Sequence, residues 1–199
     1  MREAQTQRLA PNERRALLVA AAEEIFATRG YTQAGLAEVA AQAGVSKTLL
    51  YHYFPEGRPE LYREVMDRLA GEVVAAVRAA TSTPTAPADR LDRLVAALVT
   101  HFTERPSSYR LLITEPWGSG EPSVVGQAVA IRARLARELN TLLAPAGEAL
   151  AVTVGGGAAA LGAVLHVCEL QLAGQITGEE ATDVAQRFVR GGLDALGLI

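Results

Sequence analysis

The sequence is poor in the residues that build catalytic and metal sites: it has three histidines, one cysteine and one tryptophan among 199 residues. A lone Cys168 excludes an internal disulfide and fits a reducing compartment, so we expect a cytoplasmic protein. The histidines and the cysteine lack the paired spacing of a zinc site, and we expect no metal or other cofactor. No nucleophile motif accompanies them, so an enzyme is the weakest of the alternatives.

Long apolar runs are also missing. Hydrophobic residues make up 49% of the chain, but polar groups interrupt every stretch of them. None resembles a membrane span of about 20 residues, and the first fifteen residues contain no apolar signal region. We therefore expect no membrane partner. Alanine is abundant and no stretch alternates with period two, which predicts an all-α fold.

The net charge of −3 is unevenly distributed. Residues 1–54 contain six basic and five acidic side chains, so the acidic excess lies in the rest of the chain. This balance alone does not identify a nucleic-acid binder. An acidic remainder would, however, help to keep a larger domain away from a duplex.

Residues 30–54, GYTQAGLAEVAAQAGVSKTLLYHYF, are the most informative stretch. They predict two short helices joined by a turn, which is the helix-turn-helix unit that enters the DNA major groove. Gly44 suits the left-handed residue that ends the first helix, and Ser46 suits the N-cap of the second. Leu50 and Phe54 are four residues apart and would bury one face of that second helix.

The remaining faces of the second helix would point outward. They carry the only lysine of the chain, and the alternative is an ordinary helical hairpin with a polar outer face. Lys47 would donate to guanine or to a phosphate, Thr48 would contact a base or a phosphate, and Leu49 would touch a thymine methyl.

This segment resembles the N-terminal domain of TetR-family transcriptional regulators. The resemblance rests on Gly30-Tyr31, Ala43-Gly44-Val45-Ser46 and Leu50-Tyr51-His52-Tyr53-Phe54, and it covers about the first third of the chain. It implies that Tyr51 and His52 bond phosphates, while Tyr53 packs the helix against its domain. The expected DNA-binding residues are Thr32, Ser46, Lys47, Thr48, Leu49, Tyr51, His52 and Arg58.

Two positions depart from the family pattern. Ala34 and Gly35 stand where the family often has a capping threonine, so the cap is either Gly35 or Thr32. Thr32 is then the nearest substitute for a family phosphate contact. Arg58 replaces the usual lysine before the fourth helix, in a variant one residue longer.

The pattern of apolar residues, caps and prolines predicts about nine helices. Asn12 would cap the first helix, and a capping box at Thr177 and Glu180 would open the last. The expected helices are 12–28, 36–43, 47–53, 59–80, 88–104, 107–114, 123–143, 147–173 and 177–196, with a linker at 81–87 and a loop at 115–122. We divide the chain into a flexible basic arm (1–11), a three-helix DNA-binding domain (12–58) and a larger ligand-binding and dimerisation domain (59–199).

A small-residue face predicts where two subunits meet. It comprises Ala151, Gly155, Ala158, Ala159 and Gly162, with the larger Val184 and Phe188 contributed by the last helix. The alternatives are that these residues pack inside one subunit, or that Gly155-Gly156-Gly157 breaks the helix. A homodimer would read a near-palindromic operator with half-sites about 34 Å or more apart.

By resemblance, the larger domain holds a pocket for a small-molecule effector of unidentified structure. The candidate lining residues are Tyr62, Met66, His101, Phe102, Tyr109, Trp117, His166 and Glu169. The alternative reading makes His166 a hydrogen-bonded core or interface residue and Trp117 a cover at the core edge. The sequence thus predicts a dimeric regulator that binds a DNA operator and is released by its effector. Repression is the family's commoner mode, and a ligand-independent DNA-binding protein is the alternative.

Overall fold

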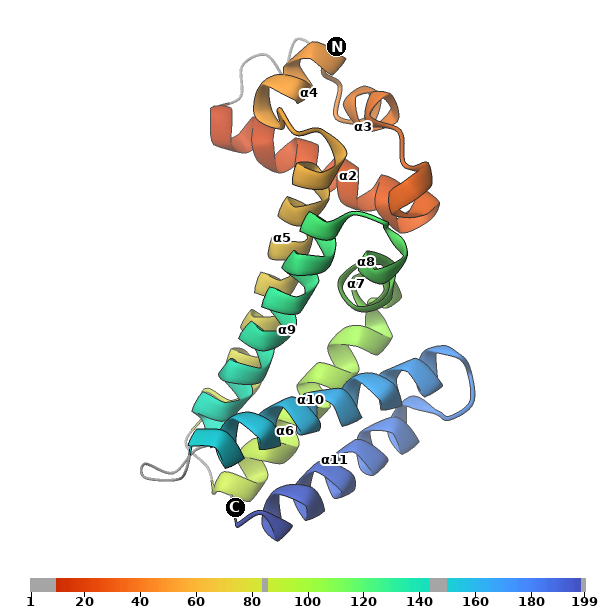
Figure 1. Ribbon diagram of the computed structural model, residues 1–199. Helices are drawn as coiled ribbons and strands as arrows, with labels where there is room; N and C mark the ends of the chain where they lie inside the picture. The colour runs from red at the N-terminus through yellow and green to blue at the C-terminus, as the bar shows by residue number, and fades with distance from the viewer. Residues whose placement is uncertain (1–9, 84–85, 144–149, 198–199) are drawn as a thin grey trace. The chain divides into compact units, whose positions relative to one another are not determined.

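The computed structural model describes residues 10–83, 86–143 and 150–197, and every regular element in those ranges is helical (Figure 1). The expected all-α fold is confirmed. The chain forms two compact units, the first comprising Met1–Leu69 with Arg110–Val129 and the second Ala70–Tyr109 with Ala130–Ile199. No helix within the described ranges is long and apolar enough to cross a membrane.

These compact units do not coincide with the division expected at residues 58 and 59. The fourth expected helix contributes its first half to the first unit, and a segment from the middle of the chain joins it there. Of the proposed arm (1–11), residues 1–9 with Arg2 and Arg8 lie outside the described residues, and Pro11 is already the first residue of a helix.

Within the described residues, the first four helices are α2 (Pro11–Gln33), α3 (Leu36–Gln42), α4 (Lys47–Tyr53) and α5 (Arg58–Ala80). Asn12 is not the cap of α2, because Pro11 occupies the first helical position and Ala10 precedes it. Proline suits that position, since its missing N–H would have no partner there in any case. The Glu13 carboxylate instead accepts the Ala10 N–H at 2.9 Å.

The core of the first unit is built on one stripe of α2. Leu18, Ala22, Ile25 and Phe26 are all buried, and their helical spacing places them on one face. The Phe26 ring meets the Tyr62 ring edge-on, with centroids 4.8 Å apart. Tyr62 is fully buried and its hydroxyl donates to the Leu111 carbonyl at 2.9 Å.

The end of α2 is held by residues from the middle of the chain. Gly30 interrupts the helix with φ 75° and ψ 169°. Just beyond it, the Tyr31 N–H donates to Glu115 Oε1 at 2.7 Å. The Arg110 guanidinium donates to the Phe26 carbonyl at 3.0 Å and also to the Ala27 carbonyl. These contacts satisfy backbone groups that a helix end would otherwise leave without partners.

We expect Gly30→Ala to lower the free energy of unfolding by roughly 1–3 kcal/mol, because this backbone conformation is essentially restricted to glycine. A Cβ at this position would in addition lie 2.6 Å from Glu115 Oε1. Urea denaturation measures the loss. Gly118→Ala is the control, because a Cβ there meets nothing within 4 Å and φ is not positive. Equal stability of the two variants would contradict the assignment.

The structure of residues 106–122 differs from two sequence predictions. The helix expected at 107–114 is divided into α7 (Pro106–Tyr109) and a π-helical turn, η1 (Arg110–Thr114). The loop expected at 115–122 contains α8 (Glu115–Gly118), with Pro116 in its first turn, where proline is compatible with a helix. Gly120, with φ 68°, then separates it from α9 (Pro122–Leu143).

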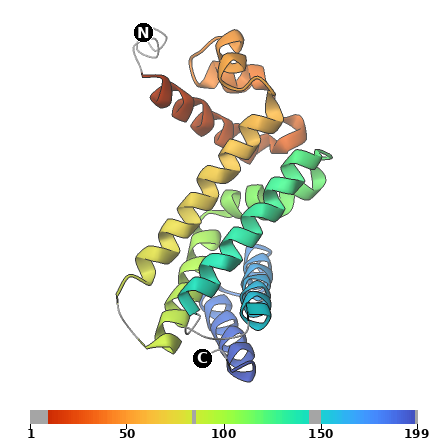
Figure 2. The same cartoon turned by 60° about the vertical axis from the view of Figure 1, so that its left-hand side comes forward.

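The second unit contains α6 (Pro87–Glu104), α10 (Leu150–Leu172) and α11 (Gly178–Ala195). Figures 1 and 2 show α10 and α11 side by side, and both pack against α6. Helix α10 runs unbroken through residues 155–157, so the three glycines do not interrupt it. The predicted capping box is confirmed: the Glu180 N–H donates to Thr177 Oγ at 3.2 Å, and Glu180 accepts the Thr177 N–H at 2.8 Å. Residues 147–149, expected in α10, lie outside the described part.

Candidate nucleic-acid interface

The turn between α3 and α4 has the predicted construction. Gly44 adopts φ 68°, and the Val45 N–H donates to the Ala40 carbonyl at 2.9 Å. Ser46 Oγ accepts the Leu49 N–H at 3.2 Å, which makes Ser46 the N-cap of α4. The predicted extent of α4, residues 47–53, is confirmed. Glycine, cap and helix therefore define a helix-turn-helix.

Helix α4 presents two contrasting faces. Leu50 and the following Phe54 are fully buried. Lys47 and Thr48 are exposed and Leu49 is half-buried at the start of the helix. Tyr51 and His52 are exposed further along it. The outward surface therefore carries a cation, a hydroxyl, an aromatic hydroxyl and an imidazole, which are groups that contact phosphates and base edges.

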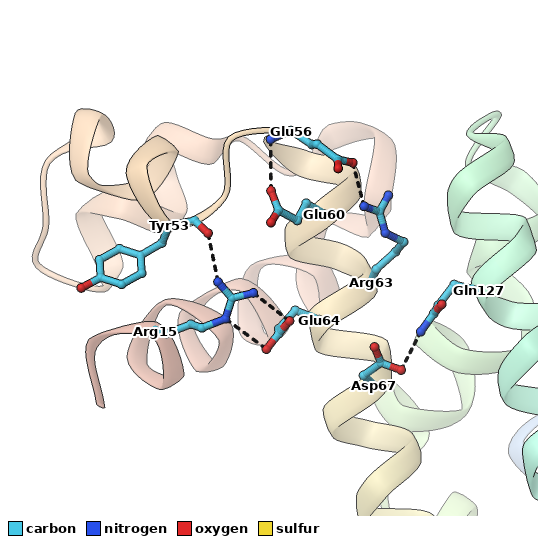
Figure 3. A network of polar contacts seen from close by, with 8 residues as sticks. All are labelled: Arg15, Tyr53, Glu56, Glu60, Arg63, Glu64, Asp67 and Gln127. Carbon is cyan, nitrogen blue, oxygen red and sulfur yellow. Dashed lines mark hydrogen bonds and ion pairs between the residues drawn. The ribbon is translucent and has the colours of Figure 1, made fainter. Parts of the chain in front are cut away.

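Two arginines of α2, which the sequence analysis did not select, hold the far end of α4. Arg14 donates to the Tyr53 hydroxyl at 3.2 Å, and Arg15 donates to the Tyr53 carbonyl at 3.0 Å. Figure 3 shows Arg15 also pointing at Glu64 of α5, where the ion pair is 2.9 Å long. The hydrogen bonds that Arg15 donates to the Glu64 carboxylate raise the pKa of Arg15, a guanidinium that is charged in any case.

Arg58 and Thr32 lie together at the end of α2. Arg58 donates to the Thr32 carbonyl at 3.1 Å, and its guanidinium lies 5.7 Å from the centre of the Tyr31 ring. This half-buried arginine is thus engaged by the end of α2. Thr32 is exposed, but Gly35 rather than Thr32 precedes α3 as its N-cap, without a side-chain hydrogen bond.

The proposed effector residues fall into several environments. Phe102 and Tyr109 of the second unit are buried with ring centroids 5.6 Å apart, and the Tyr109 hydroxyl donates to the Leu165 carbonyl at 3.0 Å. Burial is the main cause that raises the pKa of Tyr109 to about 12. His101 lies beside Phe102, and its Nε2 is 3.3 Å from Ser108 Oγ. Tyr62 and Met66 are fully buried in the first unit.

The other three candidates lie at the surface. The side chains of His166 and Glu169 are 70% and 59% exposed on α10, and their Nδ1 and Oε2 atoms are 3.4 Å apart. His166 is therefore neither a core residue nor part of the buried aromatic cluster. Trp117 is half-exposed on α8 and its indole N–H donates to the Ile113 carbonyl at 2.9 Å. Across the described residues, no three His, Cys, Asp or Glu side chains gather in a way that suits a metal ion.

His101 gives a pH dependence of known sign. Burial, and secondarily the nearby Arg105, lowers the pKa of His101 below 6.5. The unfolded chain then binds a proton that the folded chain does not, so stability falls as pH drops below about 6.5. We expect His101→Gln to lose less stability than the wild type between about pH 7.5 and pH 5.5 in urea denaturation. Parallel losses in the two proteins would show that His101 does not titrate in this way.

The fold and the exposed α4 surface define an all-helical helix-turn-helix protein. Residues 18–65 match the family described as "Bacterial regulatory proteins, tetR family". The matched segment contains α3, α4 and the turn between them, so the predicted resemblance of this segment to the TetR family is confirmed.

The chain is also similar to a named relative and to several solved structures. The chain is 38% identical over 126 residues to the HTH-type transcriptional activator FasR of Mycolicibacterium smegmatis, over 61% of this chain and 57% of that relative. The chain thus matches little more than half the length of that relative.

Solved structures share the fold over nearly the whole chain. A TetR-like transcriptional regulator from Rhodococcus sp. RHA1 has a TM-score of 0.71 at 23% identity, covering 94% of this chain and 99% of that one. The fatty acid degradation regulator FadR from Bacillus halodurans has a TM-score of 0.73 at 15% identity, covering 92% and 96%.

Proposed function

We propose that the protein is a DNA-binding transcriptional regulator of the cytoplasm that reads duplex DNA with α4. The observation that carries this proposal is the contrast between the two faces of α4. Leu50 and Phe54 anchor the helix, and the polar groups of the opposite surface are exposed. A helix held in this way can enter the major groove.

We propose that some of the exposed residues of α4 contact bases and that others contact phosphates. Lys47 and Thr48 lie at the N-terminal end of α4, the end that contacts base edges in helix-turn-helix proteins. Tyr51 and His52 lie one turn further on and would bond phosphates, which fixes the register of the helix. Ser46 contributes as the N-cap of α4. The guanidinium of Arg58 donates to the Thr32 carbonyl, so we expect Arg58 to stabilise the domain beneath the DNA-binding surface rather than to lead the contact with DNA.

We propose a homodimer formed through α10 and α11. Gly155, Ala158, Ala159 and Gly162 are all exposed on α10, which is unusual for the centre of an apolar helix. On α11, Val184 is 45% and Phe188 is 68% exposed. Ala151 belongs to the same proposed stripe, but its side chain lies outside the described set. Large exposed apolar groups beside small ones favour close contact with a second helix pair.

We propose that a small-molecule effector releases the operator. For this, the effector must bind the DNA-incompetent state more tightly than the DNA-bound state. Among the candidate residues, the buried aromatic group His101, Phe102 and Tyr109 is the part that suits a mostly apolar ligand.

Selection of bound fragments from the source genome tests the regulator proposal. Purified protein should enrich short fragments that share a near-palindromic sequence, with half-sites separated by about one or more helical turns. Failure to enrich any shared sequence at moderate salt would refute DNA reading. A reporter placed behind the selected fragment then gives the sign of regulation, which is open because the FasR relative is named an activator.

A further inference from the structure

The Arg15 side chain joins three helices of the first unit, as Figure 3 shows. Its Nη1 donates to the carbonyl of Tyr53, the last residue of α4. Its Nε and Nη2 donate to the two carboxylate oxygens of Glu64 on α5, at 3.3 and 2.9 Å. The same guanidinium lies 4.5 Å from the centre of the Phe54 ring, which is fully buried.

These contacts meet α4 at a point where a short helix is weakly held. The last carbonyls of any helix lack partners within the helix, and a cation there is favoured by the helix dipole. Because α4 has only seven residues, few internal hydrogen bonds hold it, and its direction depends on contacts with its neighbours. The Arg15 guanidinium binds the Tyr53 carbonyl and lies against the Phe54 ring. It therefore restrains the angle at which the N-terminal end of α4 meets DNA.

We infer that Arg15 is a positioning residue for DNA reading, and that Glu64 holds Arg15 in place. This inference rests on the proposed function of α4. Arg15 acts through Tyr53 and Phe54, and it does not itself touch the base edges. Its loss should leave general attraction to DNA intact and weaken the preference for the correct sequence.

The planar shape of the guanidinium allows Arg15 to bind Tyr53 and Glu64 at the same time. Three of its nitrogens are used, one on the Tyr53 carbonyl and two on the Glu64 carboxylate. A lysine ammonium is a single point charge and cannot reproduce that planar, bidentate arrangement while also reaching the carbonyl. Although Arg15→Lys keeps the positive charge, it should consequently lower operator affinity much as Arg15→Gln does.

The chain offers a matched control in Arg68. Its Nη1 pairs with Glu23 at 2.8 Å, and this ion pair joins the same two helices, α2 and α5. Arg68 follows Glu64 by one turn of α5, so its pair lies further along the helix from the Arg15 junction. Arg68→Gln removes one α2–α5 ion pair and one positive charge, as Arg15→Gln does.

The test compares wild type, Arg15→Gln, Arg15→Lys and Arg68→Gln by fluorescence anisotropy on the selected operator and on a scrambled duplex. Both Arg15 variants should lose about three- to tenfold in operator affinity with little change on the scrambled duplex. Arg68→Gln should stay within about twofold of wild type on both. The dependence of operator affinity on salt should keep its slope in every variant, because no phosphate contact is removed.

Several outcomes would overturn the inference. One is an equal effect of Arg15→Gln and Arg68→Gln, and another is a salt slope reduced by about one, which would make Arg15 a phosphate contact instead. Circular dichroism melting checks that each variant folds. Should Arg15→Gln unfold, Glu64→Gln replaces it, with the same direction of change expected. Absence of operator binding by the wild type would refute the proposed function instead.

Discussion

Lys47→Ala is expected to weaken operator binding by at least about tenfold per dimer, since a good side-chain contact to a base contributes roughly 1–3 kcal/mol of discrimination. Lys47 is exposed at the first position of α4, with its ammonium 5.8 Å from the centre of the Tyr51 ring. No buried contact is lost, so the unfolding free energy should change by less than about 0.5 kcal/mol. Gel-shift titration and urea denaturation measure the two quantities.

Lys47→Arg tests whether a positive charge at this position is sufficient for operator binding or whether lysine itself is required. Arginine also donates to guanine and to phosphate, so this variant should retain most of the affinity that alanine loses. Wild-type affinity in Lys47→Ala would show that the start of α4 does not meet the duplex, and a large loss of stability would show that Lys47 has a structural role.

Phe188→Glu is expected to abolish the proposed dimer at micromolar concentration and, with it, most operator affinity. The Phe188 side chain is 68% exposed, so a carboxylate there costs the isolated subunit little. In a two-fold interface each change occurs twice, and two carboxylates would enter a surface built from small and apolar groups. Analytical ultracentrifugation gives the association state, and anisotropy on operator DNA gives the affinity.

Arg187→Gln is the matched control for this variant. Arg187 is the preceding residue and lies on the charged face of α11, where it pairs with Asp183. Both substitutions make the net charge more negative by one, but only Phe188→Glu changes the apolar stripe. A monomeric Arg187→Gln, or a dimeric Phe188→Glu, would place the subunit contact elsewhere.

The helix-turn-helix was predictable because its signals are local. Gly44, Ser46, Leu50 and Phe54 act within one turn of their neighbours, and the structure confirms the left-handed glycine, the cap and the buried pair. The capping box at Thr177 was predictable for the same reason. Which polar residues of α4 would be exposed also followed from the helical period once the buried pair was known.

The long-range contacts that hold the helix-turn-helix and its supporting helices together were not predictable from the sequence. Arg15 and its partner Glu64 are 49 residues apart, and Arg110 reaches back 84 residues to the Phe26 carbonyl. Half-buried arginines show no period, because a long side chain can reach a carbonyl from many positions. The π-helical turn at Arg110–Thr114 likewise depends on packing, and the outward direction of His166 depends on which face of α10 is covered.

The solitary lysine has a practical consequence. Reagents that acylate ε-amino groups have one side-chain target in the entire chain, and it stands exposed at the tip of α4. The extent of acylation at Lys47, followed by mass spectrometry of the peptide that contains it, would thus act as a covalent footprint of that tip. Operator occupancy would be read as protection of a single atom, without introducing any label or mutation.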